Sequence, residues 1–139
     1  MIDILLALHM VGLMMGAGGG FGSMITMQEA AKRTPEQGGV LKTLGPAMAR
    51  FSAAGLALMW LTGLSLVFVK FGGFDDLPTL FWAKMAFVTA LTVCSILAHI
   101  TYGQLKAGNV AVAKRLPVLG PLSGASSMIA VLFAVLSFH

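Results

Sequence analysis

The stretch LLALHMVGLMMGAGGGFGSM, residues 5–24, is apolar enough to lie in lipid, yet it carries His9 and a run of glycines. Each glycine inside a helix costs up to about 1 kcal/mol relative to alanine. Glycines at this density therefore indicate that another group comes close to the helix backbone. A second helix or a bound ligand could be that group.

The composition of the whole chain places this stretch in a membrane protein. Of 139 residues, 58% are hydrophobic and only 10% are charged, which lies outside the usual range of soluble domains. A spanning helix needs about 20 mostly apolar residues. The apolar runs predict spans near 2–26, 50–70, 79–104 and 117–138. We expect an all-α integral membrane protein, an antiparallel bundle of four transmembrane helices that forms one domain over residues 1–139.

The first run is expected to stay in the mature protein rather than to be a cleaved signal peptide. Its N-terminus carries Asp3 and no Lys or Arg, and its apolar stretch is longer than a typical signal core. No soluble catalytic domain remains outside the spans and their loops. Any chemistry must therefore take place between the helices.

Loop charges predict the orientation of the bundle. The middle loop has only Lys70, offset by Asp75 and Asp76. The first and third loops carry the other basic residues: Lys32, Arg33, Lys42, Arg50, Lys106, Lys114 and Arg115. By the positive-inside rule these two loops are cytoplasmic and both termini are periplasmic, in a bacterial inner (plasma) membrane that the chain crosses several times. This topology accounts for the net charge of +4, so nucleic acid is not an expected partner.

The glycines of the first span form a pattern with two interpretations. Gly12, Gly16 and Gly20 repeat every four residues, and such small-residue faces let helix backbones approach closely. The face could pack against another helix of the chain or against a second copy in a homo-oligomer. Because His9 points to nearly the same side, the face could instead accommodate a flat ligand. The last span has a comparable seam of small residues: Ser123, Ser127, Ala130, Ala134 and Ser137.

Ionisable residues inside the spans are the sharper functional signal, because such residues are costly in lipid and usually face the bundle interior. From the helical rise, His9 and Lys84 lie roughly 10 Å and 8 Å inward from the same predicted side. His99 lies about 22 Å along its helix from Lys84 and is expected to be an interfacial residue. His139 could reach the level of His9 only if the end of the chain folds inward. We therefore predict one periplasm-side site that contains His9 and Lys84.

Three segments resemble a known membrane module. The stretches LLALHMVGLMM, RFSAAGLALMWLTGLSLVF and LFWAKMAFVTALTVCSILAHITYG look like the four-helix module shared by the copper-resistance D (CopD) family and the HemJ-type protoporphyrinogen IX oxidases. The resemblance implies haem b as cofactor, with His9 as the iron ligand. It implies that Lys84 is a second ligand or a partner of the porphyrin, and hence the candidate catalytic residue. Gly12 and Gly16 would then leave room for the macrocycle beside His9.

Two other functions remain open at this point. Copper is the alternative cofactor, because thioethers suit Cu(I) and several methionines lie in or near the predicted site: Met10, Met14, Met15, Met59 and Met85. A cofactor-free accessory subunit is the third possibility, with the glycine face docking another helix. Cys94 is expected to be a small core residue. The sequence thus predicts a haem-binding oxidoreductase or electron-transfer protein that works with a membrane redox partner, with copper handling as the alternative.

Overall fold

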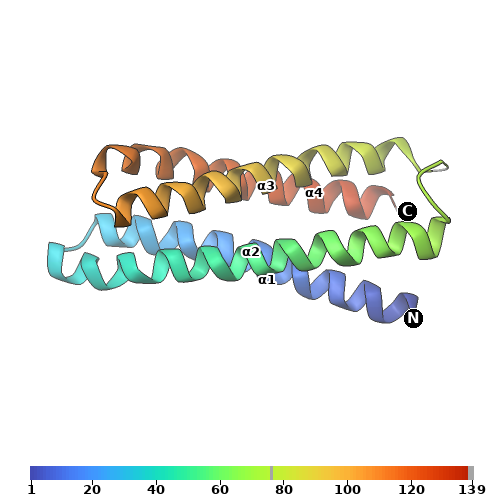
Figure 1. Cartoon of the computed structure of the whole chain (residues 1–139), viewed down its shortest axis with the longest axis horizontal. Helices are drawn as coiled ribbons and strands as arrows, with labels where there is room; N and C mark the ends of the chain where they lie inside the picture. Colours follow the sequence, from blue (N-terminus) through green and yellow to red (C-terminus); the bar gives the residue numbers. More distant parts are fainter. Residues whose placement is uncertain (76, 138–139) are drawn as a thin grey trace.

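The computed structural model describes residues 1–75 and 77–137, and this part of the chain is helical without a strand. Four α-helices follow one another: α1 (Ile2–Ala31), α2 (Pro35–Phe71), α3 (Thr79–Lys106) and α4 (Leu116–Ser137). A short 3-10 helix, η1 (Val110–Arg115), precedes α4. The predicted all-α class is therefore confirmed (Figure 1). Asp76 and His139 lie outside the described residues.

The second helix differs most from its predicted bounds. It begins at Pro35 rather than near residue 50, so the expected first loop shrinks to a short connector after Ala31. Thr34 caps the helix by accepting a hydrogen bond from the Gln37 amide at 3.5 Å, and Pro35 occupies the first turn. These are strong helix-start signals, and Pro46 inside the helix does not end it. The segment 35–49 is thus a helical extension of the second span.

Three of the helices are long and apolar enough to cross a membrane: α1, α2 and α3. In α4 the described apolar stretch, Pro121–Phe133, is shorter. Large apolar side chains cover the outer surface, as for Met14 with 74% of its area exposed and Leu61 with 68%. A surface of this kind suits lipid rather than water. The fold is that of a helical membrane protein.

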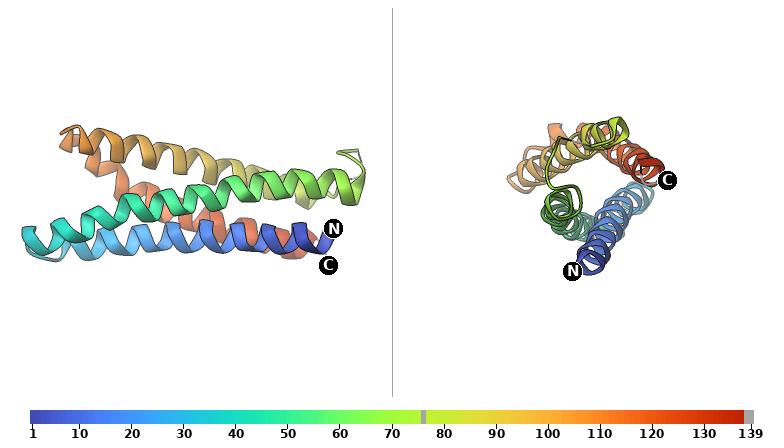
Figure 2. Two further views of the ribbon diagram at one scale, coloured as in Figure 1. Left: turned by 60° about the horizontal axis from the view of Figure 1, so that its bottom comes forward. Right: turned by 90° about the vertical axis from the view of Figure 1, so that its right-hand side faces the viewer.

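The bundle consists of two helical hairpins. Helix α1 packs along most of α2, and α3 packs along α4, while contacts between the hairpins run mainly through α1 and α4 and to a lesser extent through α2 and α3. Figures 1 and 2 show the N-terminus, the α2–α3 connector and the end of α4 at the same end of the bundle. At the connector, Gly72 ends α2 with a positive φ of 70°, which glycine adopts without steric cost.

The glycines of α1 form the contact with α2. Its buried positions there are His9, Gly12, Gly16, Gly19 and Ser23, which alternate by three and four residues. This spacing averages 3.5 residues, the repeat of helices that wrap around each other. The spacing of four predicts that this stripe continues through Gly20. In the structure it continues through Gly19 instead. The neighbours of the glycines in this stripe are atoms of α2 in the same chain.

Hydrogen bonds at the opposite end link the hairpins. The Ser23 hydroxyl donates to the Gly45 carbonyl at 3.1 Å and lies 2.9 Å from the Tyr102 hydroxyl. Nearer the middle, the Trp60 indole N–H donates to Thr92 Oγ1 at 3.0 Å. The Ser23–Tyr102 and Trp60–Thr92 bonds join α3 to α1 and α2, whereas the Ser23–Gly45 bond joins α1 to α2 within one hairpin.

Candidate functional site

A cavity of about 410 Å³ lies between the hairpins, and Ile2 and Leu6 in its lining place it near the N-terminus. All four helices contribute to its lining, which is predominantly apolar and includes Leu6, Leu13, Trp60, Phe71, Phe81 and Val131. Its volume is within the range of small-molecule and cofactor sites, about 300–1,000 Å³. A few polar groups on apolar walls are typical of such sites, and here those groups are cationic or imidazole nitrogens.

His9 reaches the cavity from α1 and is held against α2. Only 8% of its area is exposed, and its Nδ1 lies 2.9 Å from Thr62 Oγ1. The neighbouring ring carbon, Cε1, would lie 3.3 Å from a Cβ placed on Gly63. A side chain at residue 63 would therefore require the imidazole to shift by a few tenths of an ångström.

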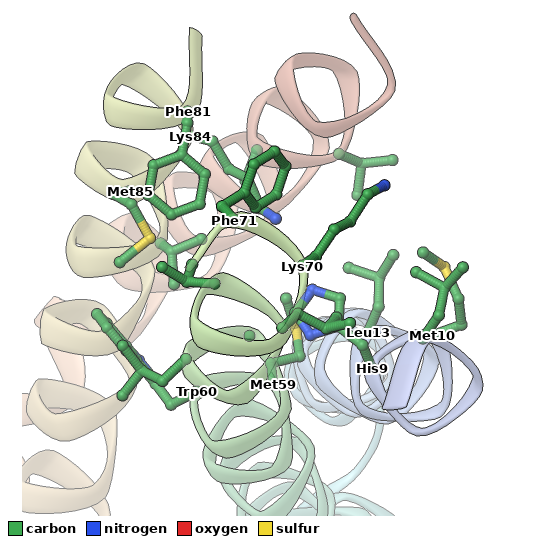
Figure 3. Close-up of a pocket in the computed structure, with 18 of the residues that line it drawn as sticks. His9, Met10, Leu13, Met59, Trp60, Lys70, Phe71, Phe81, Lys84 and Met85 are labelled. Carbon is green, nitrogen blue, oxygen red and sulfur yellow. The ribbon is translucent and has the colours of Figure 1, made fainter. Parts of the chain in front are cut away.

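Lys84 reaches the same cavity from α3, on the other hairpin. Figure 3 shows its ammonium group and the ring of His9 directed towards the space between the hairpins. Among the described residues, no carboxylate and no hydrogen-bond acceptor pairs with Lys84. A charged group in a membrane usually has a partner or marks a site. The structure therefore brings the two predicted residues together at a cavity whose described lining residues include no acidic side chain.

The other predicted site residues have different surroundings. Gly12 and Gly16 do not line the cavity and instead face α2, where a Cβ on Gly12 would lie 2.9 Å from the Gly55 carbonyl oxygen. Room beside His9 is provided by Gly63 rather than by these two glycines. His99 is half-buried and does not line the cavity, in agreement with its predicted distance from the site.

The methionines divide into two groups. Met10, Met59 and Met85 line the cavity, whereas Met14 is 74% exposed and Met15 packs near Gly55. Figure 3 shows the sulfur atoms of Met10 and Met85 on opposite sides of the cavity. Within the described part of the chain, no group of three or more His, Cys, Asp or Glu side chains could hold a metal ion. Cys94 is a buried free thiol in α3, as predicted.

Sequence reasoning missed Thr62 and Gly63, the two residues of α2 that hold the His9 ring. The only signal for them is the pair itself within the apolar stretch WLTGL, a polar residue followed by a small one. Such a pair is common in membrane helices, because a threonine hydroxyl can bond to the preceding turn. Its importance becomes visible only when α1 and α2 are in register.

The cavity offers groups that a haem site would use: one imidazole, two lysine side chains and apolar walls. A single imidazole can serve as axial ligand of haem iron, and the apolar walls suit a macrocycle. Lys84 and Lys70 both line the cavity and could face the propionates.

No protein-family model matches the chain, and no curated protein or solved structure is significantly similar to it. The class defined by fold and site is thus a helical membrane protein with an apolar cavity that is lined by one imidazole and two lysine side chains.

Proposed function

We propose that this protein binds haem b in the cavity between its hairpins and serves in electron transfer or in HemJ-like porphyrinogen oxidation. One observation carries the proposal: His9 and Lys84 come from opposite hairpins and line the same apolar cavity. Both residues are expensive to keep in a membrane without a role. A haem group would use the imidazole, the amine and the apolar walls together.

Each side chain has a part in this proposal. His9 would bind the iron through Nε2, because Nδ1 is engaged by Thr62. Lys84 would act as a second ligand or neutralise a propionate, and Lys70 adds a second cation at the cavity. When bound, haem supplies one-electron redox chemistry at a potential set by its axial ligands, its burial and nearby charge.

We further propose that four helices span a bacterial inner membrane with both termini in the periplasm. The basic residues of the first and third connectors support this orientation by the positive-inside rule. At the other end, Phe68, Phe74 and Trp82 are exposed, and the Phe74 ring lies 5.5 Å from that of Phe68 and 6.4 Å from that of Trp82, measured between ring centroids. Aromatic residues are enriched at membrane interfaces. The cavity would then lie in the periplasmic half of the bundle.

Copper handling is the second candidate function, and one observation favours it. The thioethers of Met10, Met59 and Met85 line the same cavity as His9, and thioethers and imidazole are suitable ligands for Cu(I). However, the sulfur atoms of Met10 and Met85 lie on opposite sides (Figure 3). A haem group, which needs one or two axial ligands from the protein, agrees better with this arrangement.

The absorbance spectrum and metal content of the purified protein test the proposal. A Soret band with sharp α and β bands after reduction supports a haem protein. A colourless protein that contains copper supports the second candidate. A colourless, metal-free protein that does not take up added haemin indicates an accessory subunit and would contradict the haem proposal.

A further inference from the structure

The hydrogen bonds around His9 determine which of its ring nitrogens carries a proton. Thr62 Oγ1 has a single hydrogen and donates it to the Leu58 carbonyl at 2.7 Å, one turn earlier in α2. The same oxygen lies 2.9 Å from His9 Nδ1. With its proton directed to that carbonyl, the hydroxyl oxygen has lone pairs left to accept from Nδ1–H.

A second main-chain acceptor lies near the same hydroxyl. The Met59 carbonyl oxygen is 3.4 Å from Thr62 Oγ1. The oxygen atoms of α2 near Nδ1 are thus the Thr62 hydroxyl and, beyond it, the Met59 carbonyl. In a neutral imidazole, a proton on Nδ1 leaves a lone pair on Nε2.

We propose that Thr62 is the positioning residue of this site: it accepts the Nδ1 proton of His9 and thereby leaves the Nε2 lone pair for a ligand in the cavity. Histidines that bind metals generally donate their other ring N–H to an oxygen of the protein, which sets the tautomer and the ring orientation. Gly63 completes the arrangement, because any side chain there would come within 3.3 Å of Cε1. The inference deepens the proposed haem function, but the tautomer can be measured without any cofactor.

The first experiment is ¹⁵N NMR of protein labelled at its histidines, in detergent micelles and without haem. The His9 signals are assigned by their loss in His9→Gln. We expect a protonated Nδ1 and an unprotonated Nε2 in the wild type and in Thr62→Ser, which keeps the hydroxyl. Thr62→Val, which has a similar shape without the hydroxyl, should show a mixture of tautomers. A wild-type signal from Nε2–H, or an unchanged tautomer in Thr62→Val, would overturn the proposal.

The second experiment is haemin titration of the same variants. Loss of an oxygen that holds a metal-binding histidine typically weakens binding about 10- to 100-fold. We expect a loss of this size in Thr62→Val, a shifted Soret maximum in its complex, and near wild-type binding in Thr62→Ser. Equal affinity and spectrum in Thr62→Val and wild type would contradict the positioning role. If the wild type takes up no haemin, the proposed function fails, whereas the NMR result still decides the role of Thr62.

Discussion

Two adjacent glycines of α1 provide a sharp test of the packing between α1 and α2. A Cβ on Gly19 would lie 2.7 Å from the Ser52 amide nitrogen and 2.8 Å from the Met48 carbonyl oxygen, both backbone atoms of α2. On Gly18 a Cβ would meet nothing within 4 Å. Backbone atoms cannot rotate away, so Gly19→Ala must push the two helices apart. Gly18→Ala requires no such movement.

The expected magnitudes follow from two opposing effects. Replacement of glycine by alanine inside a helix gains up to about 1 kcal/mol, and this gain is common to both variants. Overpacking a close contact costs about 1–3 kcal/mol. We therefore expect Gly18→Ala to be neutral or slightly stabilising, and the free energy of unfolding of Gly19→Ala to be lower than that of Gly18→Ala by about 1–3 kcal/mol.

Reversible unfolding in mixed micelles, with an increasing fraction of sodium dodecyl sulfate and detection by circular dichroism, measures this difference. Both variants should keep the same helix content before unfolding. Equal free energies of unfolding for Gly18→Ala and Gly19→Ala would refute the argument that α1 contacts α2 through Gly19.

Three further predictions concern the same fold. Gly16→Ala should be tolerated, because its Cβ would be 3.9 Å from the nearest atoms of α2. Gly12→Ala should lower thermal stability in detergent, and a Gly12→Ala variant more stable than Gly16→Ala would be inconsistent with the packing. Tyr102→Phe and Ser23→Ala should each cost about 0.5–1.5 kcal/mol and show coupling in a double-mutant cycle; strict additivity would mean that no hydrogen bond joins them. A reporter active only in the cytoplasm should be active after Gly108, and one active only in the periplasm should be active at the N-terminus; the opposite pattern would invert the topology.

Much of the architecture could be predicted because apolar runs and helix-stop signals are local. The observed starts of α1, α3 and α4 lie within a residue of the predicted spans. The start of α2 could not be placed in this way, because segment 35–49 contains several glycines and Pro46 and has the composition of a loop. Tertiary packing overrides this propensity, since Gly38, Gly45 and Ala49 are buried within the fold.

The candidate site was predictable in part for a similar reason. The depth of His9 and Lys84 depends only on the helical rise and on the antiparallel order of the spans, so the sequence could place them at one level. The role of Gly12 and Gly16 depends on which helix approaches them, and the structure shows that this is α2. Thr62 depends in addition on the register of α1 against α2, which no local pattern specifies.

The central claim is that His9 holds haem iron in the cavity that it shares with Lys84, and haemin titration of three single variants tests it most directly. We expect His9→Ala to lose haem binding, because no other described histidine lines the cavity. Lys84→Met should keep haem with a shifted Soret maximum or reduction potential, since a second ligand or a charge tunes the iron without being essential for binding. His99→Ala should behave as the wild type. Full haem occupancy in His9→Ala, or loss of haem in His99→Ala, would contradict the account.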